Sequence, residues 1–220
     1  MIPIRFHAKR LFDGHHFFDE RVLSIAGGKI IAIDQDTSHV DVAVEGLVVP
    51  GYIDLQVNGG GGILFNNSPS VEHLKIMMAA HAKYGTTAMM PTLITDKLEV
   101  MQQAAAAIAQ AISEKVPGIV GIHFEGPHLS QEKKGTHCVD YIRPISEAEW
   151  HIFSRTDIGQ VIVTLAPENV SPSDVTRMVA LGIKVCLGHT NADFNTAQAA
   201  INAGATGFTH LFNAMSPLQG

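Results

Sequence analysis

Ile119-Val120-Gly121-Ile122-His123-Phe124-Glu125 is the stretch of sequence that decides the fold. It is a nearly continuous apolar run that ends on a carboxylate, and such runs are typical of strands buried in a parallel sheet. Five similar runs lie at 47–57, 87–90, 161–166, 183–187 and 207–212. Between the runs the sequence predicts helices over 71–83, 97–115, 146–154, 172–181 and 193–203.

Strands that alternate with helices predict an α/β protein with a parallel sheet. Six strand units lie between residue 47 and Gly220. Two architectures suit this count: an open doubly wound sheet, or a (β/α)8 TIM-type barrel in which about six of the eight units are present.

The first 46 residues differ from the remainder because they contain short alternating strands and turn residues. Asp13-Gly14 predicts a turn, and Ala26-Gly27-Gly28-Lys29 predicts a hairpin loop. We therefore expect two domains, a small β module at 1–46 and an α/β domain at 47–220.

Composition and charge exclude several classes of protein. The 220 residues are 46% hydrophobic and 16% charged, enough for a sizeable core, and the net charge of −6 does not favour nucleic-acid binding. No apolar stretch approaches the roughly 18 residues of a membrane-spanning helix. Cys138 and Cys186 form no metal-type spacing. We expect a cytoplasmic protein that binds neither nucleic acid nor membrane.

Three candidate metal ligands follow three of the predicted strands. Glu125, His189 and His210 all lie at carboxyl ends of strands, where the loops of a parallel sheet converge. Two imidazoles and one carboxylate are a frequent ligand set for a catalytic metal that keeps a position open for water, and they accept zinc or iron. His123, on the same strand face as Glu125, could be a further ligand, but we expect a hydrogen-bonded histidine that lies behind a ligand or in the core.

Gln56 and Asn58 end the first predicted strand of the larger domain. We interpret them as groups that position water or substrate, with ordinary loop hydrogen bonding as the alternative. The glycine run 59–62 that follows lacks the helix start and the acidic partner of a dinucleotide site.

With these residues, the chain resembles the N-acetylglucosamine-6-phosphate deacetylases, a group within the amidohydrolase superfamily. The similar segments lie in the same order along most of the chain, at 49–59, 91–95, 123–128, 133–137, 165–168, 187–190 and 209–215. The superfamily usually has His-x-His on the first barrel strand. Gln56-Val57-Asn58 stands there instead, which resembles the subgroup that holds a single metal.

The resemblance implies a (β/α)8 barrel with a small β-sandwich, of which residues 1–46 would be an incomplete part. It implies one divalent metal, zinc or iron, on Glu125, His189 and His210, and sugar-phosphate contacts from Thr136, His137, Asn213 and Ala214. The implied reaction is hydrolysis of N-acetylglucosamine 6-phosphate to glucosamine 6-phosphate and acetate by a cytoplasmic homodimer.

The resemblance also places the family's general-base aspartate on the eighth barrel strand, which would lie beyond Gly220. We therefore assign no catalytic residue and expect the chain to be an amino-terminal portion. Two alternatives remain open. One is another amidohydrolase that opens a ring C–N bond, and the other is a non-catalytic fragment that binds metal or sugar phosphate.

Overall fold

A computed structural model describes residues 2–217, and the chain divides into two compact units, residues 1–51 and 52–220. The first unit is a single four-stranded sheet in the order β3-β2-β1-β4. Its strands are β1 (Ile4–Phe12), β2 (Phe17–Ala26), β3 (Lys29–Asp34) and β4 (Val42–Val48). Gly27 and Gly28 join β2 to β3 with φ of 58° and 74°, the left-handed conformation that a two-residue hairpin requires.

The expected domain limits differ from these units at their junction. Residue 46, where we expected the first domain to end, lies inside β4. This strand continues to Val48 because Leu47 and Val48 pair in parallel with Arg10 and Leu11 of β1.

The expected end of the larger domain, Gly220, lies outside the described residues 2–217. The position that we expect for the general-base aspartate, beyond Gly220, lies outside them too. We therefore still assign no catalytic residue within residues 2–217, and this remains a prediction.

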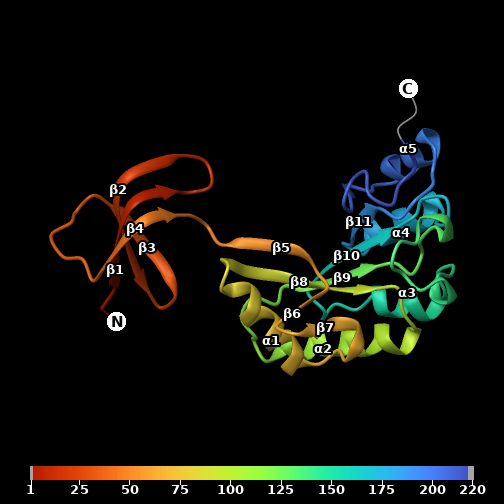
Figure 1. The fold of residues 1–220 in the computed structure, drawn as a ribbon, viewed down its shortest axis with the longest axis horizontal. Coiled ribbons are helices and arrows are strands. Elements are labelled where there is room, and N and C mark those ends of the chain that lie inside the picture. The colour runs from red at the N-terminus through yellow and green to blue at the C-terminus, as the bar shows by residue number, and fades with distance from the viewer. Residues whose placement is uncertain (1, 218–220) are drawn as a thin grey trace. The chain divides into compact units, whose positions relative to one another are not determined.

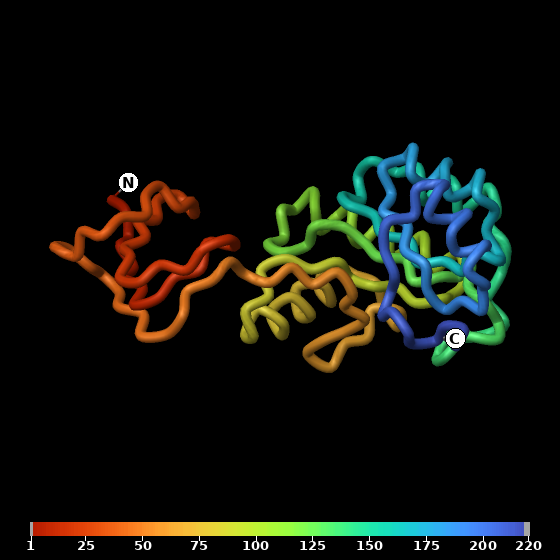
Figure 2. Tube along the Cα trace, turned by 90° about the horizontal axis from the view of Figure 1, so that it is seen from above, coloured from red at the N-terminus to blue at the C-terminus, as the bar shows by residue number. Residues whose placement is uncertain are grey.

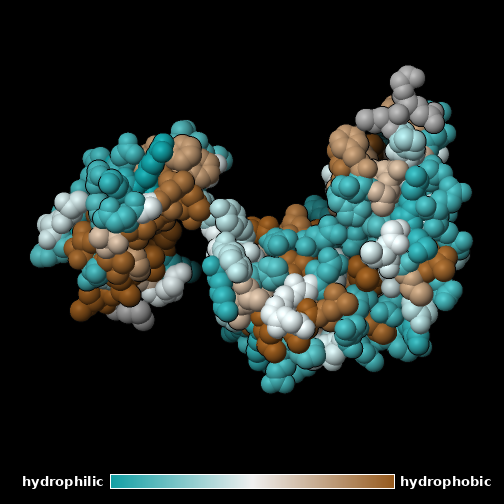
Figure 3. All heavy atoms as spheres, viewed as in Figure 1, coloured by the Kyte–Doolittle hydropathy of each residue, from teal (hydrophilic) through white to brown (hydrophobic). Residues whose placement is uncertain are grey.

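The small sheet buries few of its apolar side chains. Ala8, Leu11 and Leu23 form its buried cluster, whereas Ile30 and Ile31 on β3 are 57% and 59% exposed. Figure 3 shows apolar residues gathered over much of the visible face of this unit. Within residues 2–51 the sheet is therefore covered incompletely.

The second unit is built on a parallel sheet of six strands in chain order, β5-β8-β9-β10-β11-β12 (Figures 1 and 2). The strands are β5 (Tyr52–Val57), β8 (Thr86–Ile94), β9 (Gly121–Glu125), β10 (Gln160–Leu165), β11 (Lys184–Leu187) and β12 (Gly207–Phe208). One helix lies between each successive pair: α1 (Val71–Ala82), α2 (Leu98–Ser113), α3 (Glu147–Phe153), α4 (Pro172–Ala180) and α5 (Phe194–Asn202).

This strand order decides between the two expected architectures. A doubly wound sheet reverses its strand order at a switch point, whereas uninterrupted order with right-handed crossovers places every helix on the same face. The prediction of an α/β fold of the TIM-barrel type, with six strand units, is confirmed. Side chains of the other face point into the barrel interior.

Local sequence signals explain where the helices start. Ser146 and Glu149 form a capping box at α3, in which the Ser146 backbone N–H donates to Glu149 Oε2 at 2.8 Å. Asp193 Oδ1 accepts from Thr196 N at 2.8 Å and caps α5. The helices pack on the apolar side of the sheet, where Phe124 is fully buried within one large core cluster.

The glycine run after β5 forms a short hairpin, β6 (Gly59–Gly60) and β7 (Ile63–Leu64). Gly61 and Gly62 turn the chain with φ of 63° and 84°. The glycine run therefore forms a tight turn. Among residues 2–217, no helix combines the length and the apolar composition needed to cross a membrane.

Candidate metal centre

Glu125, His189 and His210 meet at the carboxyl edge of the parallel sheet. Glu125 is the last residue of β9, and each histidine lies two residues beyond its strand, β11 or β12. Glu125 Oε1 is 3.2 Å from His189 Nε2 and 3.3 Å from His210 Nε2, and the two Nε2 atoms are 3.0 Å apart. Within residues 2–217 this is the one group of three His, Cys, Asp or Glu side chains with ligand atoms so close together.

Backbone carbonyls decide which ring nitrogen of each histidine faces the cluster. His189 Nδ1 donates to Lys133 O at 2.8 Å, and His210 Nδ1 donates to Asn213 O at 3.2 Å. Because a neutral imidazole carries one proton, both Nε2 atoms then present lone pairs. Two lone pairs and a carboxylate oxygen thus face one another, an arrangement that a cation would stabilise.

The spacing of these three atoms fits a metal ion. Ligand atoms bound to zinc at about 2.0–2.1 Å in tetrahedral geometry lie roughly 3.3–3.4 Å apart. The measured separations of 3.0–3.3 Å are close to this value. Glu125 and His189 are buried, whereas the His210 side chain is 29% exposed, so the cluster is accessible from one side.

The cluster keeps its carboxylate ionised. Burial raises the pKa of Glu125, but the hydrogen bond that His189 donates from Nε2 when its ring is protonated, together with the nearby His137 and His123, outweighs burial and lowers this pKa to about 2. Burial lowers the pKa of His189, but the bonds that its protonated ring donates to Glu125 and to the Lys133 carbonyl raise it overall. Glu125 is therefore a negatively charged ligand candidate throughout the neutral pH range.

His137 lies beside the cluster with the opposite ring orientation. Its Nε2 is 4.0 Å from Glu125 Oε1, and its Nδ1 accepts from the Thr95 backbone N–H at 3.2 Å. Nε2 of the neutral ring therefore carries the proton. Burial and the neighbouring His189 lower the pKa of His137 to about 4, so it is a neutral hydrogen-bond donor near pH 7.

The other residues expected in the site lie around this edge. Thr136 is exposed next to His137. Asn213 orients His210 through its carbonyl, and the Ala214 carbonyl accepts from Thr190 N at 3.1 Å.

Gln56 and Asn58 are half-buried on either side of Val57, at the end of β5. His123 is hydrogen-bonded through both ring nitrogens, to Leu55 O at 3.0 Å and to Thr164 Oγ1 at 2.7 Å. Both ring nitrogens of His123 are thus occupied, and neither bond goes to Glu125, His189 or His210.

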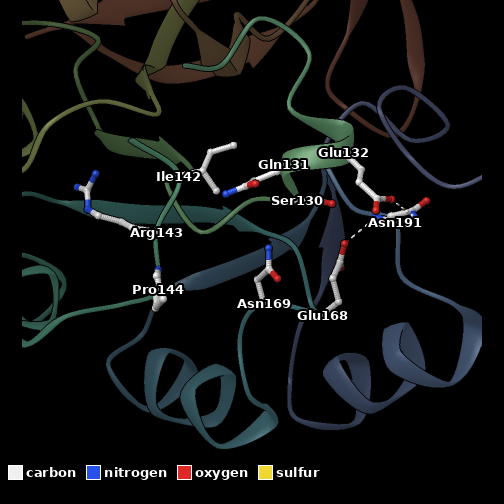
Figure 4. Close-up of a pocket in the computed structure, with 9 residues that line it drawn as sticks. All are labelled: Ser130, Gln131, Glu132, Ile142, Arg143, Pro144, Glu168, Asn169 and Asn191. Carbon is white, nitrogen blue, oxygen red and sulfur yellow. Dashed lines mark hydrogen bonds between the residues drawn. The ribbon is translucent and has the colours of Figure 1, made fainter. Parts of the chain in front are cut away.

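Sequence reasoning missed Thr95, which orients His137, and Glu168, which holds the loop after His189. Glu168 accepts from Thr190 Oγ1 at 2.5 Å and from Asn191 N at 2.6 Å. Both missed residues directly follow, or lie close to, the carboxyl end of a strand, the signal that identified Glu125. Figure 4 shows Glu168 and Asn191 on the wall of a cavity of about 500 Å³ that contains none of the three clustered residues.

Comparison with known proteins identifies the family. Residues 47–218 match the model of the Amidohydrolase family. The chain is 57% identical over 173 residues to the N-acetylgalactosamine-6-phosphate deacetylase of Shewanella sp. (strain ANA-3), a match that covers 79% of this chain and 44% of the relative. It is 42% identical over 171 residues to the N-acetylglucosamine-6-phosphate deacetylase of Haemophilus influenzae, covering 77% of this chain and 44% of that relative.

A solved structure agrees with the fold. The crystal structure of N-acetylglucosamine-6-phosphate deacetylase from Pasteurella multocida superimposes with a TM-score of 0.89 at 37% identity, over 99% of this chain and 59% of that one. The two sequence matches cover 44% of each curated relative, so the chain spans less than half of their length. The match to the family model covers most of the chain, and the chain belongs to the amidohydrolase family.

Proposed function

We propose that the protein is a metal-dependent amide hydrolase that converts N-acetylglucosamine 6-phosphate to glucosamine 6-phosphate and acetate. The observation that carries this proposal is the triangle of Glu125 Oε1, His189 Nε2 and His210 Nε2, with sides of 3.0–3.3 Å. The names of the relatives support the substrate class. They do not favour a hydrolase of ring C–N bonds.

Each group at the sheet edge has a place in this reaction. Glu125, His189 and His210 would hold one divalent cation, zinc in the first instance. Such a cation polarises an amide carbonyl and lowers the pKa of water that it binds. His137 would donate from Nε2–H to an oxygen of the substrate, because Thr95 fixes the proton on that nitrogen. We assign further contacts with the sugar phosphate to Thr136, Asn213 and Ala214, and positioning of water or substrate to Gln56 and Asn58.

A second substrate, N-acetylgalactosamine 6-phosphate, is favoured by one specific observation. The relative at 57% identity bears that name, whereas the relative at 42% is named for the glucosamine compound. The two sugars are epimers at one ring carbon, and the acetamide that reacts is the same in both. The proposed metal chemistry therefore applies to either sugar.

The remaining parts of the proposal concern the whole protein. We propose a cytoplasmic homodimer in which residues 1–46 belong to a small β-sandwich and the general-base aspartate lies beyond Gly220. The net charge of −6 is consistent with a small-molecule substrate rather than nucleic acid.

Acetate release from both sugar phosphates tests the proposal. We expect the whole protein loaded with zinc to release acetate from at least one of them. The Glu125→Gln variant removes a ligand itself, so it should lose at least the roughly 100-fold that loss of a group behind a ligand can cost. His151→Asn is the matched control, because His151 is an exposed histidine of α3 outside the cluster. No acetate from either compound, or full activity of Glu125→Gln, would refute the proposal.

A further inference from the structure

A buried chain of hydrogen bonds crosses the interior face of the parallel sheet beneath the metal centre. His123 of β9 bonds to Thr164 of β10 at 2.7 Å, and Thr164 Oγ1 is 2.6 Å from Thr209 Oγ1, the residue after β12. All three side chains are at most 5% exposed. The proposed reaction gives none of them a role.

All hydrogen bonds of this series are donated in one direction, from Thr209 toward the Leu55 carbonyl. Leu55 O can only accept, so His123 Nδ1–H donates to it at 3.0 Å. The other ring nitrogen, Nε2, is then an acceptor, and the Thr164 hydroxyl donates to it. Thr164 Oγ1 in turn accepts from the Thr209 hydroxyl. Every polar side-chain group in the chain therefore has a partner, as a buried network requires.

The far end of the chain is anchored at an irregularity of β5. Leu55 lies inside the register shift between Asp54 and Val57, where β5 leaves its regular pairing with β8. His123 satisfies the Leu55 carbonyl, and Thr92 Oγ1 accepts from the Val57 backbone N–H at 3.0 Å. The chain thus links β5 at one edge of the sheet to the residue after β12 at the other edge.

The three hydrogen-bonded residues alternate with the three candidate ligands along the sequence. His123 stands two residues before Glu125, and Thr209 directly precedes His210. Thr164 is the register partner of Glu125 in the neighbouring strand.

The third ligand, His189, follows Gly188, over which Thr164 and Thr209 meet. A Cβ atom on Gly188 would lie 2.8 Å from Thr164 Cγ2 and 3.0 Å from Thr209 Cβ. A side chain at this position would therefore force the two threonines apart. The absence of a side chain here allows the chain of hydrogen bonds to pass across β11.

We propose that His123, Thr164 and Thr209 are positioning residues that set the spacing of Glu125, His189 and His210. The inference rests on the proposed metal centre. The chain of hydrogen bonds ties β9, which carries Glu125, through Thr164 to Thr209, which precedes His210, and both threonines pack on Gly188, which precedes His189. Metal affinity depends on the separation of the ligands, because all three come from different strands.

Zinc affinity, measured by competition with a chromophoric chelator, tests the proposal without any activity assay. Thr164→Val keeps the shape of the side chain but removes both hydrogen bonds of the hydroxyl, and we expect zinc to bind about tenfold more weakly, the lower end of the effect of groups behind a metal ligand. Thr164→Ser restores the hydroxyl and should bind within about twofold of the wild-type chain. Thr209→Val, which removes one bond at the end of the chain, provides a milder second variant.

Val163→Thr is the matched control. Val163 is the fully buried neighbour of Thr164 on β10, and its side chain belongs to the core on the helix side. A hydroxyl there destabilises the sheet without touching the hydrogen-bond chain, so zinc affinity should stay at the wild-type value. Equal affinity of Thr164→Val, Thr209→Val and wild type would overturn the inference, and so would an equal loss in Val163→Thr. Absence of zinc binding by the wild-type chain would instead refute the proposed function.

Discussion

Breaking the ion pair between Arg143 and Glu149 should destabilise the protein strongly, and Arg143→Met tests this expectation. Glu149 is 1% exposed and accepts from Arg143 Nε at 2.6 Å. Removing one partner of a buried pair costs about 3–5 kcal/mol because the other charge stays buried. Ser146 still donates to Glu149 in the variant and the Arg143 side chain is 27% exposed, so we expect the lower end of this range, about 3 kcal/mol of unfolding free energy.

Urea unfolding followed by fluorescence measures this loss. Trp150, the single tryptophan, follows Glu149 directly in α3 and is 6% exposed, so its emission reports the unfolding of this part of the chain. With a dependence of about 2–3 kcal/mol per molar urea, the midpoint should fall by about 1 M.

Two further variants make the reasoning refutable. Arg155→Met breaks the pair with Asp157, whose side chain is 59% exposed, and should cost less than about 1 kcal/mol. Arg143→Met combined with Glu149→Gln should regain part of the stability, since no unpaired charge remains and the glutamine can still cap α3. If Arg143→Met lowers the midpoint no more than Arg155→Met, the buried pair does not have the stated effect.

Two other predictions test the site and the sheet. Folding lowers the pKa of His137 from 6.5 to about 4, so between these two pH values the unfolded chain binds a proton that the folded chain does not. Between pH 7.5 and pH 5 the unfolding free energy of the metal-free wild type, measured with urea, should therefore fall by about 2 kcal/mol more than that of His137→Asn. Equal losses in the two proteins would contradict this prediction. Gly121→Ala would drive a Cβ into the backbone oxygen of Gln160 in the paired strand, and should abolish the cooperative thermal transition of this unit in circular dichroism. Gly46→Ala, with no atom within 4 Å of the added Cβ, should change stability by at most about 0.5 kcal/mol, and the same melting curve for both variants would disprove the steric argument.

The sequence predicts the helices well because their signals are local. The helix expected over 146–154 is α3, Glu147–Phe153, and its capping box consists of residues three positions apart. Assignment of strands to sheets depends on distant pairing and is less predictable. Leu47-Val48 continue the apolar run that leads to β5, yet they pair with β1, nearly forty residues earlier, in the small sheet.

The positions of the metal-centre residues were predictable, but their orientations were not. Carboxyl ends of parallel strands meet at one edge, which is why Glu125, His189 and His210 could be grouped from spacing alone. The proton positions on His189 and His210 depend on the carbonyls of Lys133 and Asn213, which lie in loops without sequence periodicity. A weak signal was available for Thr164, whose hydroxyl interrupts the apolar residues 161–165 of β10.

Metal content of the purified chain tests the central claim most directly. After equilibration with zinc and removal of the unbound ion, elemental analysis should find about one zinc per wild-type chain, and the same for His151→Asn. We expect Glu125→Gln and His189→Asn to lose this zinc, because each removes one of three ligands. A wild-type chain that retains no metal, or variants that retain as much as the wild type, would contradict the assignment of this cluster as a metal centre.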